Sequence, residues 1–283
     1  MSGAAFDPSE ALPTARADDF ASRAKRVRRL VRVLIGMDIK LKYGDSALGY
    51  VWTVGKPMAL FSILYVVFGK LVKFQQTGSH YALYLVIGVM LWSFFADGVT
   101  RTMASIVTNG SLLRKLPFPR LVIPLSASLT AFVTFGLGLI PIAVFIAWNG
   151  LVPRLNWLLL IPLALELYLV IFGLGLVLAV MYVRLRDVAQ VWELVMQLLF
   201  FLAPIVYPFT LVSARGRQVM LLNPFTQIMQ DFRSIIIYPD HTVIAAPAAF
   251  SPLRVLPLLG AAFILGLGLY MFKHEEPWLP ERV

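Results

Sequence analysis

Six long apolar stretches constrain the fold of this chain more than any other feature of its 283 residues. A helix needs roughly 20 apolar residues to cross a hydrocarbon core about 30 Å thick, and most of the stretches reach that length. With short connections they occupy nearly the whole chain, which leaves no room for a large soluble domain. We therefore predict an all-α, polytopic membrane protein with six transmembrane helices. The predicted spans are 54–72, 81–103, 121–148, 157–182, 191–212 and 253–272.

The composition agrees with this fold class and argues against several enzyme classes. The chain is 59% hydrophobic and 14% charged, whereas soluble domains are about 25% charged. It has no cysteine, and its three histidines are too far apart for a metal motif. No GxxxxGK[ST] loop is present, because Gly55-Lys56 and Gly69-Lys70 lack the glycine-rich lead and the following Ser or Thr. We expect no catalytic site, no metal and no cofactor in this chain.

Lysine and arginine are distributed unevenly between the two sets of connections. Of the 25 Lys and Arg residues, 18 fall on one side: the N-terminal segment through residue 56, the second and fourth connections and the C-terminal tail. Seven fall on the other side. Cytoplasmic loops are enriched in Lys and Arg, so we expect both termini in the cytoplasm. The net charge of +10 thus reflects topology, and we expect no nucleic-acid partner.

The N-terminal region divides into two parts. Residues 1–20 are acidic and polar and are predicted to be a mobile tail. Residues 21–42 place apolar side chains at helical spacing against a basic face, which predicts an amphipathic helix in the membrane interface. A solvated helix that supplies positive charge is the alternative. The permease domain then covers 43–272, and 273–283 forms a cytoplasmic tail.

Two connections carry further signals. The connection 104–120 is polar, then amphipathic, and then stopped by two prolines, which predicts a short helix parallel to the membrane. Residues 209–252 mix apolar runs too short to span with several prolines, so we predict a re-entrant helical hairpin on the outer side. Pro204 and Pro208 should bend the fifth span. The mid-span Gly-x-Gly pairs at 136/138, 173/175 and 266/268 are predicted to be helix-packing faces.

Ionisable and aromatic residues inside the spans are candidates for a transport path. Asp97 and Arg101 are four residues apart and should pair on one helix face. Glu166 and Glu193 could line an aqueous path or pair across helices, and they support an alternative, a proton-coupled carrier of a small solute. Aromatic residues near the span ends could form an interfacial belt or face inward and stack on sugar rings. The predicted substrate channel consists of Trp92, Phe94, Phe95, Tyr168 and Glu166.

Several strings taken together resemble the permeases of polysaccharide-exporting ABC transporters, which include O-antigen, teichoic acid and galactan exporters. The resemblance covers about residues 30–272 and departs from the family at Gly44-Asp45, where another basic or small residue is common. The strings are KYGDSALGYVW at 42–52, YLVIG at 84–88, LWSFF at 91–95, NGSLLRKLPFPR at 109–120, PIVYP at 204–208, LNPF at 222–225, and Phe232-Arg233.

The resemblance implies a homodimeric permease with two copies of a separate subunit that binds ATP and Mg²⁺. Helix 21–42 and a coupling helix at 110–116 would dock on that ATPase, and a hairpin within 215–240 would gate the outer exit. The cargo would be a polyprenyl-pyrophosphate-linked glycan, with galactan as the first guess because the Ala/Val-rich composition hints at a high-GC source. A drug or lipid efflux permease of the same class is a further alternative. The implied residues are Ser111, Leu112, Leu113, Arg114, Lys115 and Leu116 for coupling, and Asn223, Pro224, Phe225, Phe232 and Arg233 for the gate. The resemblance also implies the inner membrane of a bacterium. Lys40, Lys42 and Lys56 lie near the predicted inner mouth, where they could attract the pyrophosphate of the carrier; ordinary positive charge on the cytoplasmic side is the alternative.

Overall fold

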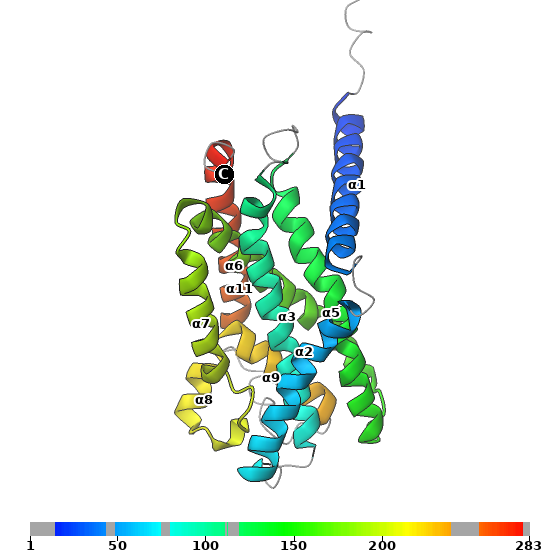
Figure 1. Ribbon diagram of the computed structural model, residues 1–283, viewed down its shortest axis with the longest axis vertical. Coiled ribbons are helices and arrows are strands. Elements are labelled where there is room, and N and C mark those ends of the chain that lie inside the picture. Colours follow the sequence, from blue (N-terminus) through cyan, green and yellow to red (C-terminus); the bar gives the residue numbers. More distant parts are fainter. Residues whose placement is uncertain are drawn as a thin grey trace, which may run out of the picture.

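The computed structural model describes residues 15–43, 49–74, 80–110, 112, 119–238 and 255–279. Within these ranges all regular structure is helical, as the apolar pattern predicted (Figure 1). The helices are α1 (Ala15–Tyr43), α2 (Gly49–Leu64), η1 (Tyr65–Leu71), α3 (Tyr81–Thr108), α5 (Val122–Trp148), η3 (Leu155–Leu159), α6 (Leu160–Arg184), α7 (Val188–Leu202), η4 (Phe209–Leu211), α8 (Ala214–Met220), α9 (Pro224–Ile237), α11 (Val255–Glu275) and η6 (Glu276–Trp278).

Five helical segments in the described ranges are long and apolar enough to cross a membrane. They match the predicted spans one to four and six. The predicted fifth span, 191–212, differs because α7 ends at Leu202 after 15 residues. At 1.5 Å per residue it is only about 22 Å long, too short for a hydrocarbon core of about 30 Å. The five segments are Val51–Leu71, Tyr81–Thr108, Val122–Trp148, Leu155–Arg184 and Pro257–Trp278.

The helical structure is interrupted at Pro204 and Pro208, the two prolines that were predicted to bend the fifth span. Ala203 is extended at ψ 138°, and Pro208 is extended at ψ 132°, so helical hydrogen bonding stops between them. Proline cannot donate the backbone hydrogen bond that would continue the helix. Residues 203–208 therefore have backbone carbonyls that lack helical partners inside the bundle.

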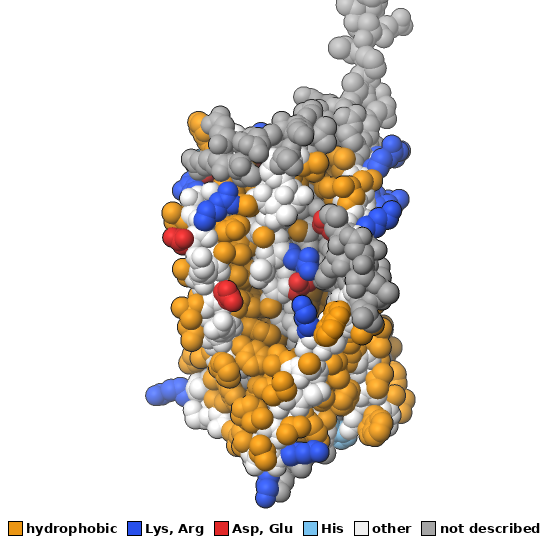
Figure 2. Space-filling model, in the orientation of Figure 1, with side chains coloured by type: hydrophobic (Ala, Val, Ile, Leu, Met, Phe, Trp, Pro, Cys, Tyr) orange, Lys and Arg blue, Asp and Glu red, His pale blue; other side chains and the backbone are white. Residues whose placement is uncertain are grey.

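Helices α3 and α6 form the centre of the bundle. In their most apolar windows 78% and 61% of residues are buried, against 11% for α2 with η1 and 22% for α11. Helix α3 packs against α2, α5, α6 and α9, while α11 packs mainly on α6. The outer helices leave large apolar side chains exposed, which produces the broad hydrophobic surface in Figure 2. Such a surface is typical of contact with lipid or with another membrane-embedded chain.

The Gly-x-Gly prediction holds where α6 meets its neighbours. A Cβ on Gly173 would lie 2.6 Å from the Leu265 Cα, and one on Gly268 would lie 2.4 Å from the Gly173 carbonyl oxygen. A Cβ on Gly175 would lie 2.5 Å from Thr102 of α3. Small residues thus let these backbones approach closely. At Gly136, Gly138 and Gly266 an added Cβ would meet no atom of the described residues closer than 3.8 Å, so the packing role of these glycines stays a prediction.

Both ends of the described chain lie at the same end of the molecule, and α8 lies toward the opposite end (Figure 1). Helix α1 begins at Ala15, inside the predicted tail 1–20, and it packs against α5. Its placement in a membrane interface stays a prediction. Of the predicted coupling segment 110–116, only Gly110 and Leu112 belong to the described residues.

The described part of the predicted C-terminal tail 273–283 packs on the bundle, and its cytoplasmic location stays a prediction. Helix α11 continues to Glu275, and η6 follows directly. The Glu275 side chain is buried and forms an ion pair with Arg184 at the end of α6. The Glu276 carboxylate accepts a hydrogen bond from the Arg120 backbone N–H at 3.4 Å. These contacts hold residues 275 and 276 against the bundle. The pair with Arg184 also supplies the partner that the buried Glu275 carboxylate requires.

Candidate functional site

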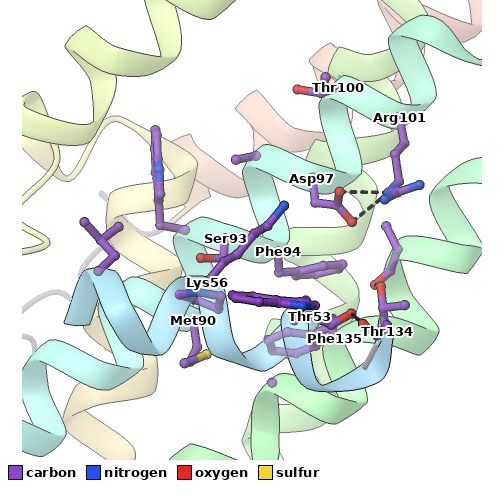
Figure 3. Close-up of a pocket in the computed structure, with 18 residues that line it drawn as sticks. Thr53, Lys56, Met90, Ser93, Phe94, Asp97, Thr100, Arg101, Thr134 and Phe135 are labelled. Atoms are coloured by element: carbon purple, nitrogen blue, oxygen red, sulfur yellow. Dashed lines mark hydrogen bonds and ion pairs between the residues drawn. The ribbon is translucent and has the colours of Figure 1, made fainter. Parts of the chain in front are cut away.

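An open groove with a volume of about 1020 Å³ lies between α2, α3 and α5 (Figure 3). Helix α2 supplies one wall, and the groove is accessible from outside because α2 belongs to the least buried of the five candidate spans. Polar, charged and aromatic side chains share its surface. The lining residues are Gly49, Trp52, Thr53, Lys56, Pro57, Leu60, Met90, Trp92, Ser93, Phe94, Ala96, Asp97, Thr100, Arg101, Ala131, Thr134, Phe135 and Gly138.

The charges in the groove come from α2 and α3. The Arg101 Nε lies 2.8 Å from both carboxylate oxygens of Asp97, which confirms the predicted i,i+4 pair. Lys56 lines the same groove, is exposed, and makes no ion pair in the described part of the chain. Of the other predicted entrance lysines, Lys40 is exposed on α1 and does not line the groove, and the Lys42 side chain lies outside the described residues.

The predicted channel residues divide between the groove and the core. Trp92 and Phe94 line the groove, and the Phe94 ring stacks on Phe135 with centroids 4.4 Å apart. Phe95 is buried beneath it against Phe225, with ring centroids 5.0 Å apart. Tyr168 is also buried, and its hydroxyl lies 3.0 Å from that of Ser128.

The remaining channel candidate, Glu166, belongs with Tyr168 on α6. Neither residue lines the groove, and neither does Glu193, which is exposed on α7. Helix α6 packs on α3 but has no residue in the groove. The groove therefore contains two of the five predicted channel residues, Trp92 and Phe94.

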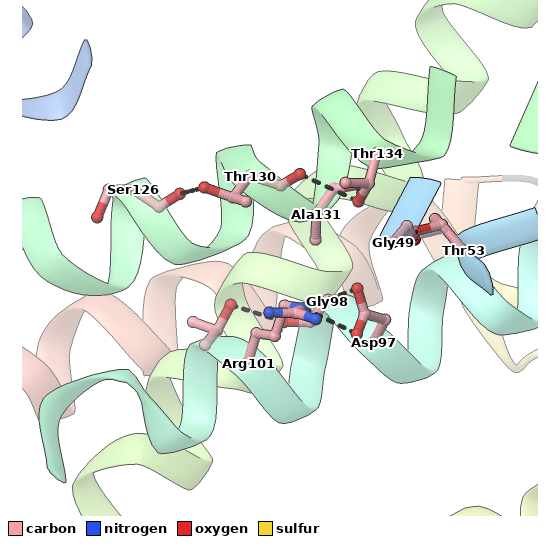
Figure 4. A network of polar contacts seen from close by, with 10 residues as sticks. Gly49, Thr53, Asp97, Gly98, Arg101, Ser126, Thr130, Ala131 and Thr134 are labelled. Atoms are coloured by element: carbon pink, nitrogen blue, oxygen red, sulfur yellow. Dashed lines mark hydrogen bonds and ion pairs between the residues drawn. The ribbon is translucent and has the colours of Figure 1, made fainter. Parts of the chain in front are cut away.

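Hydroxyl groups along α5 are satisfied within their own helix (Figure 4). Thr130 Oγ1 donates to the Ser126 carbonyl at 2.9 Å, and Thr134 Oγ1 donates to the Ala131 carbonyl at 2.8 Å. On α2, Thr53 Oγ1 donates to the Gly49 carbonyl at 3.3 Å. This pattern lets an apolar helix present polar atoms without leaving a buried donor unpaired.

Helix α1 brings a second carboxylate toward Arg101. Burial raises the pKa of Asp38, and the positive charge of Arg101 and a hydrogen bond with Thr130 oppose that rise. Arg101 therefore lies close to acidic groups from two helices, Asp97 of α3 and Asp38 of α1. This second interaction could not be predicted, because Asp38 and Arg101 are far apart in the chain.

A second arginine cluster lies around the break that follows α7. Arg233 of α9 is 1% exposed and donates three hydrogen bonds to backbone carbonyls. Its Nη1 donates to Pro204 at 2.7 Å, its Nη2 to Ile205 at 2.8 Å, and its Nε to Tyr84 at 3.0 Å. The guanidinium carbon lies 3.5 Å from the centroid of the Tyr84 ring. A cation–π contact of this kind adds to the attraction at a desolvated site.

Two tyrosines and a glycine of α3 complete this cluster. Tyr81 Oη donates to the Val206 carbonyl at 2.9 Å, and Tyr84 Oη donates to the Tyr207 carbonyl at 3.1 Å. A Cβ on Gly88 would lie 2.2 Å from the Arg233 Nη2, so only glycine leaves room for the guanidinium. The carbonyls freed by the proline break thus find donors on α3 and α9. Irregular backbone at membrane depth requires such partners.

The predicted gate residues fall at the start and along the buried face of α9. Asn223 Oδ1 accepts a hydrogen bond from the Phe225 N–H at 3.0 Å, and Pro224 occupies the first helical position. This combination is a common helix start. Phe225, Phe232 and Arg233 are buried. Helices α8 and α9 follow each other closely, but re-entry into a membrane stays a prediction.

Comparison with known proteins assigns the chain to a family. The family model described as ABC-2 type transporter matches residues 29–237, which is most of the chain. The chain belongs to the ABC-2 type transporter family. The ABC-2 match begins within α1 and ends at the last residue of α9, so the groove and the Arg233 cluster both lie inside it.

Several curated proteins are similar to this ABC-2 family member. The O-antigen export system permease protein RfbA of Klebsiella pneumoniae is 30% identical over 209 residues, covering 74% of this chain and 80% of the relative. RfbA of Myxococcus xanthus is 29% identical over 230 residues, covering 79% and 87%. The polysialic acid transport protein KpsM of Escherichia coli is 22% identical over 254 residues, covering 87% and 93%.

Proposed function

We propose that this ABC-2 family member is the permease subunit of an ATP-driven exporter that moves a lipid-linked polysaccharide from the cytoplasm to the outer face of the bacterial inner membrane. The observation that carries the proposal is the similarity, over most of both chains, to proteins named for O-antigen export and polysialic acid transport. Because the sequence has no phosphate-binding loop, a separate subunit would bind ATP and Mg²⁺ and hydrolyse the nucleotide.

The open groove supports a path for a polymer. A long glycan cannot be enclosed in a sealed pocket, so it needs a continuous channel. A second copy of the chain placed against α2 and α5 would close the groove between two protomers. The proposed exporter is therefore a homodimer of this chain with two ATPase subunits. The lining suits sugars, because aromatic faces stack on sugar rings and hydroxyls exchange hydrogen bonds with them.

The direction of transport rests on charge. The sequence assigns 18 of the 25 Lys and Arg to the side of the N-terminal and C-terminal segments, and α1 begins and α11 ends at one end of the molecule (Figure 1), which favours the cytoplasm for that end. Helix α1 and the segment 110–116 at that end would contact the ATPase. The opposite end, where α8 lies, would open to the outside, with α9 as part of its gate.

Two alternatives are less well supported. A proton-coupled carrier would use Glu166 or Glu193, yet neither lines the groove. A drug or lipid efflux permease would favour a closed apolar pocket, whereas this groove is open and contains Lys56, Asp97 and Arg101. Among polysaccharides, galactan is the first cargo to test, with O-antigen and teichoic acid next.

Depletion of the protein in its native host tests the proposal. Radiolabelled, lipid-linked polymer should accumulate on the cytoplasmic side, and re-expression of the wild-type chain should restore export. Trp52→Ala should restore it poorly, because Trp52 lines the groove and is 57% exposed. Phe263→Ala is the matched control, because Phe263 is 70% exposed on α11, away from the groove. An unchanged distribution of polymer after depletion would contradict the proposal.

The partner subunit needs its own test. Affinity purification of the full chain should recover a nucleotide-binding subunit, and the double charge reversal Arg114→Glu and Lys115→Glu should weaken the association. An intact complex in that variant would remove the coupling role from 110–116. Glycan transport by the chain alone, without nucleotide, would overturn the ATP-driven mechanism.

A further inference from the structure

Residues 275–279, which we call the C-terminal clasp, contact the ends of other helices of the bundle. Arg184 Nε, at the end of α6, donates to the Glu275 Oε2 at 3.4 Å, and its Nη2 donates to Oε1. The Glu276 Oε1 accepts a hydrogen bond from the Arg120 N–H at 3.4 Å, just before α5. Leu279 is 2% exposed. It belongs to a buried cluster to which α3, α5 and α6 contribute Ile106, Ile123 and Val183.

The start of α5 has no cap from its own sequence. Leu121 occupies the N-cap position, its side chain carries no hydrogen-bond acceptor, and the first turn contains no acidic residue. The N–H groups at a helix start lack intrahelical partners, and negative charge is favourable there. Glu276 brings a carboxylate to this point from a residue 156 positions later in the chain. The Arg120 carbonyl accepts from the Ile123 N–H at 3.2 Å, so the contact with Glu276 extends into the first turn of α5.

The end of α3 is closed in a different way. The backbone N–H and the Nδ2 of Asn109 both donate to the Ser105 carbonyl, at 3.1 and 2.9 Å. These contacts are local, because both residues belong to the last turn of the same helix. The chain between α3 and α5 contains the segment 110–116, which would contact the ATPase. One attachment of that segment is therefore local, and the other depends on the C-terminal clasp.

We propose that Glu276 is a positioning residue for ATP-driven transport, which holds the start of α5 so that motion of the ATPase subunit moves α5 as a whole. Helix α5 lines the groove through Thr134 and Phe135, so its displacement changes the groove. The pair of Glu275 with Arg184 anchors the clasp to α6, one of the two central helices. Without Glu276 the start of α5 yields locally, and less of the motion reaches the groove. The inference rests on the proposed function, because that function supplies the ATPase.

Hydrogen exchange of the purified full-length chain in detergent micelles tests the contact without the ATPase. In the Glu276→Ala variant, amides in the first two turns of α5 should exchange about fivefold faster, because one hydrogen bond to the helix start is lost. Glu276→Gln should retain most of the protection, since its amide oxygen still accepts from Arg120. Lys273→Gln is the control, because Lys273 is exposed on the last turn of α11. Thermal unfolding of each variant verifies its fold.

The complex of the chain with its ATPase subunit, reconstituted in proteoliposomes, tests the transport step. The cargo is radiolabelled lipid-linked polymer extracted from depleted host cells. In the Glu276→Ala variant, the glycan exported per ATP hydrolysed should fall several-fold, while association with the ATPase and the KM for ATP stay unchanged. Glu276→Gln should restore most of the export. A residue with a merely structural role would instead lower ATP hydrolysis and export together.

Three results would overturn the proposal. Exchange in α5 could be unchanged in the Glu276→Ala variant, Lys273→Gln could accelerate it as much, or the glycan exported per ATP could stay at the wild-type value. Each of these outcomes rejects the role of Glu276 and leaves the proposed function standing. An unchanged distribution of polymer after depletion of the chain would reject that function, whereas the exchange measurement would still report whether Glu276 holds the start of α5.

Discussion

Two arginines in this molecule are stabilised in opposite ways. Arg233 is 1% exposed and donates to three backbone carbonyls, while Arg101 is 35% exposed and pairs with a carboxylate. The partners of Arg233 are neutral groups of the backbone, which cannot move without moving α3 and the segment after α7. The partner of Arg101 is a flexible side chain, which can rotate away at little cost.

The difference separates a structural arginine from an exchangeable one. Transfer of a charge out of water is costly, and only good geometry with several hydrogen bonds compensates for it. Arg233 meets that condition, so it fixes the break after α7 against α3 and α9. Arg101 keeps part of its hydration, so its ion pair contributes little to stability.

The largest effect is expected from Arg233→Ala. The change removes the guanidinium donors from the buried carbonyls of Tyr84, Pro204 and Ile205. A buried acceptor left without a donor costs about 1–3 kcal/mol. We expect a large loss of folded protein in detergent, measured by thermal unfolding with size-exclusion chromatography. Arg215→Ala, at an exposed arginine on α8, is the control. Equal unfolding temperatures for the two variants would contradict the structural role of Arg233.

Gly88→Ala should come next, because its new Cβ would lie 2.2 Å from the Arg233 Nη2 and force the guanidinium to move. The losses for Gly88→Ala and Arg233→Ala should not add in the double variant, since both disrupt the same contacts. Gly136→Ala on α5 is the control: nothing lies within 4 Å of its added Cβ, and alanine favours a helix by about 1 kcal/mol. Additive losses in the double variant would show that Gly88 acts elsewhere.

The contrast also explains which features the sequence could predict. Long apolar runs predict spans, and the four-residue spacing predicted the Asp97–Arg101 pair, because both signals lie within one helix. Pro204 and Pro208 predicted a disturbance in the fifth span. The partners of Arg233 could not be predicted, because they are backbone carbonyls and every residue carries one. A useful signal was present, however: a proline break in an apolar run requires nearby donors, and Tyr84 and Arg233 are candidates.

Helix rotation and long-range contacts were the other gaps. In the string 91–95, Trp92 and Phe95 face Phe225 of α9, while Phe94 faces Phe135 of α5. Aromatic composition alone cannot tell these directions apart. Tyr168 and Glu166 were assigned to the channel for the same reason, since residue type gave no information on which side of α3 their helix would pack.

Arg101→Gln sharpens the comparison from the other side. An ion pair that is about one third exposed contributes only about 0–1 kcal/mol, so the unfolding temperature should change little. Glycan export should nevertheless fall, because Arg101 lines the groove. The measurement is thermal unfolding in parallel with the export assay on the same preparations. A stability loss as large as that of Arg233→Ala would mean that Arg101 is a structural residue as well.

The smallest expected effect is on the stability of α1 packing, and it depends on pH through Asp38. Burial raises the pKa of this carboxyl above its ordinary value of 3.8, although Arg101 and Thr130 oppose the rise. A carboxyl whose pKa is higher in the folded state loses stability when it ionises. The contribution is therefore present below pH 3.8 and is lost as the pH rises through the raised value.

The packing of α1 on α5 should accordingly loosen slightly between about pH 4 and neutrality. Hydrogen exchange of α1 amides, corrected for intrinsic rates, measures this change. Asp38→Asn should remove the pH dependence and leave α1 better protected at neutral pH. The Arg101→Gln variant, which retains Asp38, should show a larger pH dependence. The positive charge of Arg101 that stabilises the ionised Asp38 carboxylate is absent in that variant. If Arg101→Gln left the pH dependence of α1 protection unchanged, Asp38 and Arg101 would not interact. Asp97 would then be the acidic partner of Arg101.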